Sequence, residues 1–253
     1  MLLRRICCGG ICVCAVICVD LQYCYYVCTI KYHIGMDNLT IPRLTEAARD
    51  FCELERGQYM KELFSITDGK AVGTFVEHRF KAFLADRYTL DIGNTAEGLD
   101  LPSVNTDIKV TSARLPQSSC PYRDSKQKIY GLGYNLLVFV YSKHDDNVRK
   151  ASCLNFVSCT FIAAGRTADY QTTFGLRQII QNGGNEEDIF AFLCDHKIPA
   201  DEVTLMNMAR DILREPPALG YLTISNALQW RLQYSRAVSL GGEIEGITSV
   251  FKA

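Results

Sequence analysis

The sequence DLPSVNTDIK, residues 100–109, decides the fold class of this chain. Residues 106–111 read TDIKVT, and this alternation of polar and apolar side chains predicts a β-strand. Because side chains two residues apart lie on the same face of a strand, Asp107 and Lys109 are expected to project together. A turn at the preceding proline would return Asp100 to the same place. The segment therefore predicts two carboxylates and one ammonium group beside a single strand.

These side chains suit one kind of chemistry. Two hard oxygen ligands with an open aqueous position favour Mg²⁺. A neighbouring lysine can orient or help deprotonate a water and offset charge on a phosphate, as metal-assisted phosphodiester hydrolysis requires. The spacing alone is a weak signal, because short patterns recur by chance. An exposed strand face with solvated charges is the alternative interpretation.

The surrounding pattern predicts a mixed α/β domain. An apolar run at residues 134–141, YNLLVFVY, is typical of a central strand buried on both faces. A helix with Glu77 in its middle precedes the charged segment. A further strand is expected over 154–164 and a polar loop over 114–125. After Gly165 the chain is expected to be mostly helical. The expected helices span 40–63, 70–88, 126–132, 173–182, 186–196, 200–214 and 223–238.

Composition sets the outer limits. The chain has 253 residues, of which 48% are apolar and 22% charged, which excludes a disordered or fibrous protein. Lysine and arginine number 27 against 28 acidic residues, so the whole chain carries no basic signal for nucleic acid. A nucleic acid would therefore have to bind a local basic patch.

The cysteines mark a boundary near the N-terminus. Seven of the 12 lie within residues 1–35, and the rest are scattered. A signal peptide, a membrane anchor within residues 6–30 and a zinc site are possible readings, although the apolar run is short for a span and the spacings fit no zinc pattern. The favoured interpretation is that the native chain starts at Met36, so that 36–253 is the functional domain. The scattered cysteines suggest reduced thiols and a cytoplasmic protein.

The chain is expected to contain a helix bearing Glu77, then D-L-P-x(4)-D-x-K on a strand, a polar loop, a short helix and an apolar strand. This order of elements resembles the PD-(D/E)xK nuclease superfamily. The similarity is greatest to MutH-type nicking endonucleases and type II restriction endonucleases, and it covers roughly residues 70–142. Gly73 stands where that group has a glycine before the acid-bearing helix. The second acid is Asp107, where MutH-like proteins usually have glutamate, and the interval from Glu77 to Asp100 is longer than in that group.

The resemblance implies a restriction-endonuclease-like αβββαβ core with a mixed central sheet, followed here by a helical C-terminal part. It implies that Asp100, Asp107 and the carbonyl of Ile108 bind Mg²⁺, and that Lys109 positions the attacking water. Glu77 would be a helper acid that binds a second metal or orients water. Cleavage would be in line, with inversion at phosphorus, and would leave a 5′-phosphate.

Two polar segments are candidates for DNA contact. The first follows the charged strand directly and concentrates positive charge with hydroxyl and amide groups that suit phosphates and base edges. The second begins at Arg166 and either enters a helix N-terminus as a recognition loop or caps that helix. The candidate contacts are Arg114, Gln117, Ser118, Ser119, Tyr122, Arg123, Lys126, Lys128, Gln171 and Arg177.

The function expected is a Mg²⁺-dependent, sequence-specific type II restriction endonuclease acting on double-stranded DNA. Cutting a palindrome calls for a homodimer, and a cognate DNA methyltransferase is the expected genetic partner. No NTP is expected, because the chain lacks a P-loop. The alternatives are a MutH-like nicking nuclease of mismatch repair, a non-catalytic DNA-binding protein on the same scaffold, and a membrane-attached protein.

Overall fold

The computed structural model describes residues 6–8, 11–13, 37–90, 98–120, 123–225 and 230–253. The chain divides into two units, Met1–Asp37 and Asn38–Ala253. In the first unit, β1 (Ile6–Cys8) and β2 (Ile11–Val13) form an antiparallel pair. A helix long and apolar enough to cross a bilayer is not found in the part of the chain that the structure describes.

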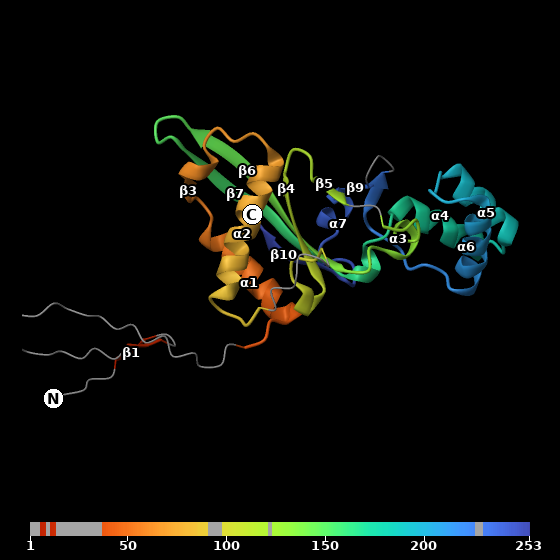
Figure 1. The fold of residues 1–253 in the computed structure, drawn as a ribbon, viewed down its shortest axis with the longest axis horizontal. Helices are drawn as coiled ribbons and strands as arrows, with labels where there is room; N and C mark the ends of the chain where they lie inside the picture. Colours follow the sequence, from red (N-terminus) through yellow and green to blue (C-terminus); the bar gives the residue numbers. More distant parts are fainter. Residues whose placement is uncertain (1–5, 9–10, 14–36, 91–97, 121–122, 226–229) are drawn as a thin grey trace, which may run out of the picture. The chain divides into compact units, whose positions relative to one another are not determined.

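The second unit is built on a mixed sheet (Figure 1). Its two long strands, β6 (Asn135–Asp146) and β7 (Ala151–Ile162), are antiparallel. On one side β4 (Thr106–Ser112) runs parallel to β6. On the other side β10 (Ile247–Lys252) and β3 (Tyr59–Met60) both pair antiparallel with β7. The sheet order is β10-β7-β6-β4, which confirms the expected mixed central sheet.

Strand β6 is central because both of its faces are apolar. Leu137 and Phe139 belong to the core on one face of the sheet, and Leu136 and Val138 to the core on the other. All four side chains are fully buried. A strand covered on both faces needs a continuous apolar run, as its sequence shows. The prediction of a buried central strand is confirmed.

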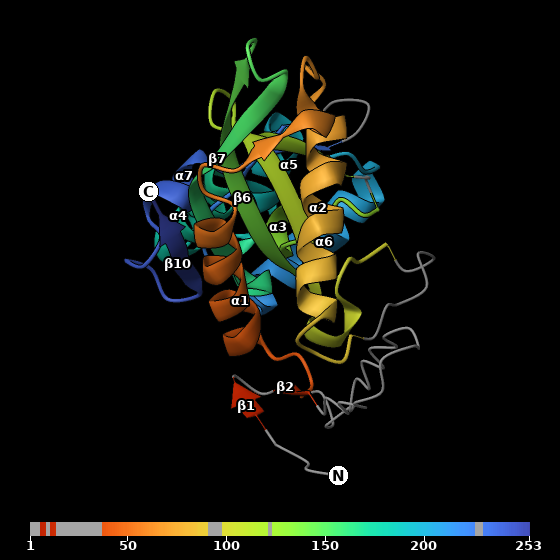
Figure 2. The same ribbon diagram turned by 90° about the vertical axis from the view of Figure 1, so that its left-hand side faces the viewer.

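Two helices lie side by side on one face of the sheet (Figure 2). Helix α1 (Ile41–Leu54) begins with a proline in its first turn, where the missing N–H costs nothing. Helix α2 (Gly69–Ala85) is capped by Asp68, whose carboxylate accepts the backbone N–H groups of Lys70 and Ala71. The helix expected over 40–63 therefore ends earlier than predicted, and a turn, β3 and a 3₁₀ segment follow it.

Phe51 joins these helices to the sheet. Its buried ring contacts four other phenylalanine rings, with centroids 5.1–5.9 Å away. Phe51→Ala should lower the free energy of unfolding by about 3–5 kcal/mol, because it removes this contact area and leaves a cavity. Urea denaturation measures the loss. Leu54→Ala on the same helix is the control, since Leu54 is 56% exposed. Equal losses in the two variants would contradict the assigned core.

The opposite face carries a second, small sheet. It consists of β5 (Gln117–Cys120), β9 (Trp230–Gln233) and β8 (Thr223–Ser225), in that order and antiparallel, followed by α7 (Ser235–Ser239). The expected loop thus contains a strand, and the helix predicted over 223–238 is wrong. Pairing of β9 on both sides and the β-branched residues of β8 favour strands there. Strand β10 was also not expected.

A helical bundle completes the second unit and lies at one end of it in Figure 1. It consists of α3 (Gln127–Tyr130), α4 (Tyr170–Gln181), α5 (Glu186–Asp195) and α6 (Glu202–Arg214). Its own apolar core includes Leu176, Ile189 and Leu193. The expected helices of this region are confirmed within a few residues. Short 3₁₀ segments occur at Lys61–Leu63, Pro102–Val104 and Ala164–Arg166.

Candidate active site

A tight turn brings the first acid of the charged segment back to β4. Residues Pro102–Val104 form a 3₁₀ turn, and Asn105 adopts a left-handed conformation with φ of 46°. Leu101 and Thr106 then exchange both backbone hydrogen bonds, at 3.0 and 3.1 Å. This reversal places Asp100 beside the strand that follows it. The predicted turn is confirmed.

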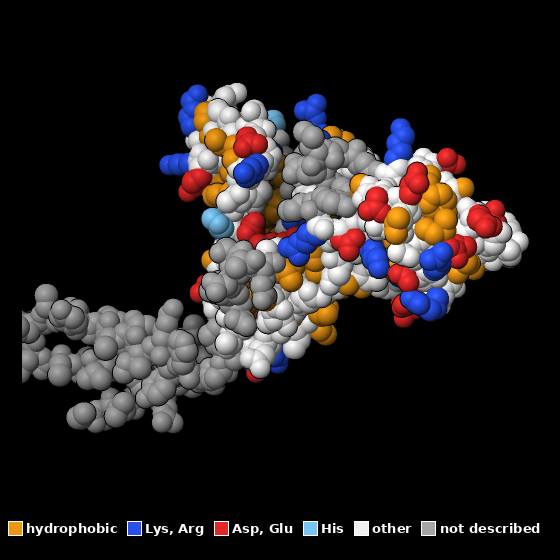
Figure 3. Space-filling view, turned by 45° about the vertical axis from the view of Figure 1, so that its right-hand side comes forward, with side chains coloured by type: hydrophobic (Ala, Val, Ile, Leu, Met, Phe, Trp, Pro, Cys, Tyr) orange, Lys and Arg blue, Asp and Glu red, His pale blue; other side chains and the backbone are white. Residues whose placement is uncertain are grey.

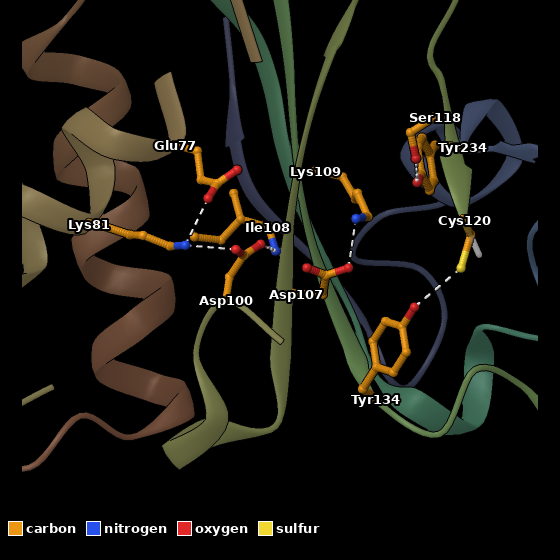
Figure 4. Close-up of polar contacts among 10 residues, drawn as sticks. All are labelled: Glu77, Lys81, Asp100, Asp107, Ile108, Lys109, Ser118, Cys120, Tyr134 and Tyr234. Carbon is orange, nitrogen blue, oxygen red and sulfur yellow. Dashed lines mark hydrogen bonds and ion pairs between the residues drawn. The ribbon is translucent and has the colours of Figure 1, made fainter. Parts of the chain in front are cut away.

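Asp100 connects β4 to α2. One carboxylate oxygen, Oδ2, accepts the backbone N–H of Ile108 at 2.8 Å. The other, Oδ1, accepts from the ammonium group of Lys81 at 2.7 Å. The same ammonium group lies 2.7 Å from Oε1 of Glu77, one helical turn earlier on α2 (Figure 4). Lys81 therefore holds two carboxylates from different elements.

Asp107 and Lys109 project together from β4, as the strand period predicts. The ammonium Nζ of Lys109 lies 2.7 Å from Oδ2 of Asp107. The Asp107 side chain is 8% exposed and that of Lys109 is 21% exposed. Ile108 points the other way, into the core beneath α1 and α2. Figure 4 shows the Glu77–Lys81–Asp100 group on one side of β4 and the Asp107–Lys109 pair on the other.

The carboxyl groups of Asp100 and Asp107 lie close enough to share a hydrogen bond. Burial and this neighbour raise the pKa of Asp107 from 3.8 to about 7, against the opposing effect of Lys109. Burial would also raise the pKa of Asp100, but hydrogen bonds from Asp107, Lys81 and the Ile108 amide lower it to about 2. Asp107 is therefore the carboxyl that keeps a proton in weakly acidic solution, while Asp100 is ionised.

Two tyrosines line the Lys109 side of the strand in Figure 4. The hydroxyl of Tyr134 is hydrogen-bonded to Sγ of Cys120 at 3.3 Å, and that of Tyr234 to the hydroxyl of Ser118. Burial raises the pKa of both phenols, and the charge of Asp107 acts in the same direction. Both tyrosines therefore stay protonated as hydrogen-bonding walls of the site. The sequence interpretation did not single them out.

The residues predicted as catalytic thus lie beside β4 in two groups, Glu77 with Asp100 on the α2 side and Asp107 with Lys109 on the other. Lys81 was missed, although its position four residues after Glu77 on a helix was a visible signal for a shared face. The side chain of Lys81 is 33% exposed. Burial opposes its charge, but hydrogen bonds to Asp100 and Glu77 outweigh this and raise its pKa.

The first group of candidate DNA contacts surrounds β5. Gln117, Ser118 and Ser119 lie on this strand, and Ser119 is exposed. Arg114 is exposed in the turn between β4 and β5. The guanidinium of Arg123 is exposed and packs against a glycine two residues before Asp100, so close that a Cβ there would lie 2.9 Å from Nη2. Tyr122 lies outside the described residues.

The remaining candidates lie on the helical bundle. Lys126 forms an ion pair with Asp211 at 3.3 Å. Lys128 is only 7% exposed, and burial lowers its pKa. Its side chain therefore faces the protein interior.

Helix α4 begins with a cap. Asp169 is buried, and its carboxylate accepts the N–H and hydroxyl of Thr172 at 2.9 and 2.7 Å and the amide of Ile224 at 2.7 Å. Of the two interpretations of this segment, the helix cap is therefore present. Gln171 is exposed in the first turn of α4, and Arg177 donates to the carbonyl of Pro217 at 3.0 Å.

Figure 3 shows one face of the molecule, which is hollowed near its middle. Acidic and basic side chains meet in this hollow, whereas the far end of the same face carries mixed charges and apolar side chains.

Comparisons with known proteins give two findings. Residues 38–249 match the family model described as type II restriction enzyme NspV. The type II restriction enzyme NspV of Nostoc sp. is 46% identical over 217 residues, which are 86% of this chain and 99% of that protein. No solved structure gives a significant match.

Proposed function

We propose a mechanism on the premise that this chain belongs to the NspV family of type II restriction enzymes and is therefore a site-specific deoxyribonuclease. Membership in that family favours a restriction enzyme over a nicking repair nuclease or a non-catalytic scaffold. The observation that carries the mechanism is the convergence of Asp100, Asp107 and Lys109 at one strand. We infer that these groups hydrolyse phosphodiester bonds with Mg²⁺.

The donor set fits Mg²⁺. Asp100 and Asp107 supply carboxylate oxygens, and the carbonyl of Ile108 directly follows Asp107 in the chain. Groups of three or more His, Cys, Asp or Glu side chains in a metal-binding arrangement do not occur among the described residues. Mg²⁺ does not need them, because it keeps several waters and takes one or two carboxylates. The raised pKa of Asp107 supports this assignment, since a cation would replace its proton.

The roles of the side chains follow from their charge and position. When bound, Mg²⁺ would polarise the phosphate and lower the pKa of a water. The ammonium group of Lys109 would donate a hydrogen bond to the attacking water and stabilise negative charge on the phosphorane-like transition state. Glu77 would be the helper acid. In-line attack would invert the configuration at phosphorus and leave a 5′-phosphate and a 3′-hydroxyl.

DNA contacts are proposed for the candidate side chains that reach the surface. Arg123 and Ser119 are exposed near β4, and Arg114 and Gln117 flank them. Gln171 and Lys126 extend the same list onto the bundle. Lys128 and Arg177 have interior or backbone contacts, which suit a supporting role for these residues in the DNA-binding surface. Tyr122 remains a predicted contact from the sequence.

The remaining proposals concern the biological setting. A palindromic site cut in both strands needs two active sites related by a two-fold axis, so we infer a homodimer. A cell that contains such an enzyme must protect its own sites, which supports a cognate DNA methyltransferase as genetic partner. Double-stranded DNA in the cytoplasm is the proposed substrate, and no NTP is required.

Digestion of a plasmid of known sequence tests this function. With Mg²⁺ or Mn²⁺ the protein should cut at a small set of identical sites, and T4 ligase should rejoin the ends because they carry 5′-phosphates. With EDTA no cutting should occur. Cutting without a divalent ion, or at sites that share no sequence, would contradict the proposal.

A further inference from the structure

Lys81 occupies a position that the mechanism above does not use. Its ammonium group lies 2.7 Å from a carboxylate oxygen of Glu77 and 2.7 Å from one of Asp100. We propose that Lys81 is a built-in cation that fills the place of a second divalent ion, so that each chain binds one metal ion. This inference rests on the proposed metal-dependent cleavage and assigns Lys81 as a positioning residue.

The contacts of Asp100 support a single ion. Two-metal nuclease sites hold their ions about 3.5–4 Å apart, which requires a carboxylate that both ions can share. Here Asp100 directs Oδ1 to Lys81 and Oδ2 to the amide of Ile108. Each carboxylate oxygen has about two lone pairs, so Asp100 keeps acceptor capacity toward Asp107. The helix side of Asp100 is already occupied by an ammonium group.

Glu77 is held in the same way. It precedes Lys81 by four residues on α2, which is the favourable order for an ion pair on one helix face. Its side chain is 28% exposed, so it is not forced into this contact by burial. Its carboxylate is therefore paired with the ammonium group of Lys81 on the same helix. Because this ion pair already balances its charge, Glu77 does not require a second metal ion.

The charges give the same answer. Glu77, Asp100 and Asp107 oppose Lys81 and Lys109, which leaves one excess negative charge when all are ionised. One divalent ion makes the centre positive and complementary to a phosphate. A second ion would have to enter beside an ammonium group that is covalently fixed to α2, against like-charge repulsion.

Counting bound Mn²⁺ tests the inference without relying on activity. Equilibrium dialysis of the full chain against Mn²⁺ alone should give one ion per wild-type chain. Lys81→Met keeps an unbranched side chain only one atom shorter and removes its charge, so it should give two. Lys81→Arg, which keeps the charge, should give one. Lys70→Met is the matched control from the exposed first turn of the same helix and should also give one.

A second variant keeps the test decisive if Lys81→Met fails to fold by circular dichroism. Lys81→Gln removes the same charge with a polar side chain and should also give two ions. Two ions in the wild type, or one ion in a folded Lys81→Met or Lys81→Gln variant, would overturn the role of Lys81 alone. No ion in a folded wild-type chain would instead overturn the metal site of the proposed function, and this inference with it.

Discussion

Replacing Lys109 by alanine is expected to lower the rate of DNA cleavage by about 1,000-fold, the upper range for loss of one transition-state donor. The reason is that its ammonium group lies at the acid pair, 2.7 Å from Asp107, where the attacking water and the phosphate would meet. Plasmid linearisation with Mg²⁺ measures the rate. A gel-shift assay with Ca²⁺ should show that DNA binding is retained.

Lys70→Ala provides the control for this experiment. Lys70 is exposed at the start of α2 and belongs to none of the proposed contacts with metal or DNA. Its variant should cut at the wild-type rate. A Lys109→Ala variant that cuts as fast as the wild type would contradict its role, and one that loses binding and cleavage equally would make Lys109 a DNA contact only.

Replacing Asp107 by asparagine is expected to abolish cleavage and, at the same time, to stabilise the metal-free protein at pH 8. The first effect follows because the variant loses a proposed metal ligand. The second follows because the pKa of Asp107 is raised from 3.8 in the unfolded reference to about 7. Between these values the native carboxyl keeps a proton that the unfolded chain has lost, so stability falls as pH rises.

The size of this effect follows from the width of the pH window. Each pKa unit corresponds to about 1.4 kcal/mol, so the wild type should lose on the order of a few kcal/mol between pH 4 and 8 relative to the variant. Asparagine has no ionisation and keeps that stability. Thermal unfolding in EDTA at pH 4 and pH 8 measures the difference, which should be small at pH 4 and large at pH 8.

Asp50→Asn is the matched control, because Asp50 is exposed on α1. Its stability should differ from that of the wild type by the same small amount at both pH values. A variant Asp107→Asn that is less stable than the wild type at pH 8 would show that the ion pair with Lys109 dominates over burial of the carboxylate.

The local parts of the site were predictable from the sequence. A period of two residues fixes the face shared by Asp107 and Lys109, and the apolar run of β6 fixes the centre of the sheet. The turn before β4 was expected from its proline and asparagine. These features depend on neighbours in the chain, and the structure confirms each of them.

The non-local parts were not predictable. Strand β5 is only four residues long and pairs with β9, more than 100 residues later. Short strands of this kind depend on the partner strand more than on their own sequence. The contact of Lys81 with Asp100 was missed for a similar reason. It joins α2 to the residue before the turn that leads into β4, and no local sequence pattern predicts that these two parts of the chain approach each other.

The two backbone hydrogen bonds that Leu101 and Thr106 exchange, here called the clasp, have a consequence for how this family can diverge. Both hydrogen bonds of the clasp are made within six residues, so the separation of Asp100 and Asp107 is fixed locally. Insertions upstream, between α2 and Asp100, change the length of a connector and leave the acid pair intact. Natural variants should therefore tolerate length polymorphism before the first aspartate, whereas a single inserted codon inside the clasp should be eliminated by selection.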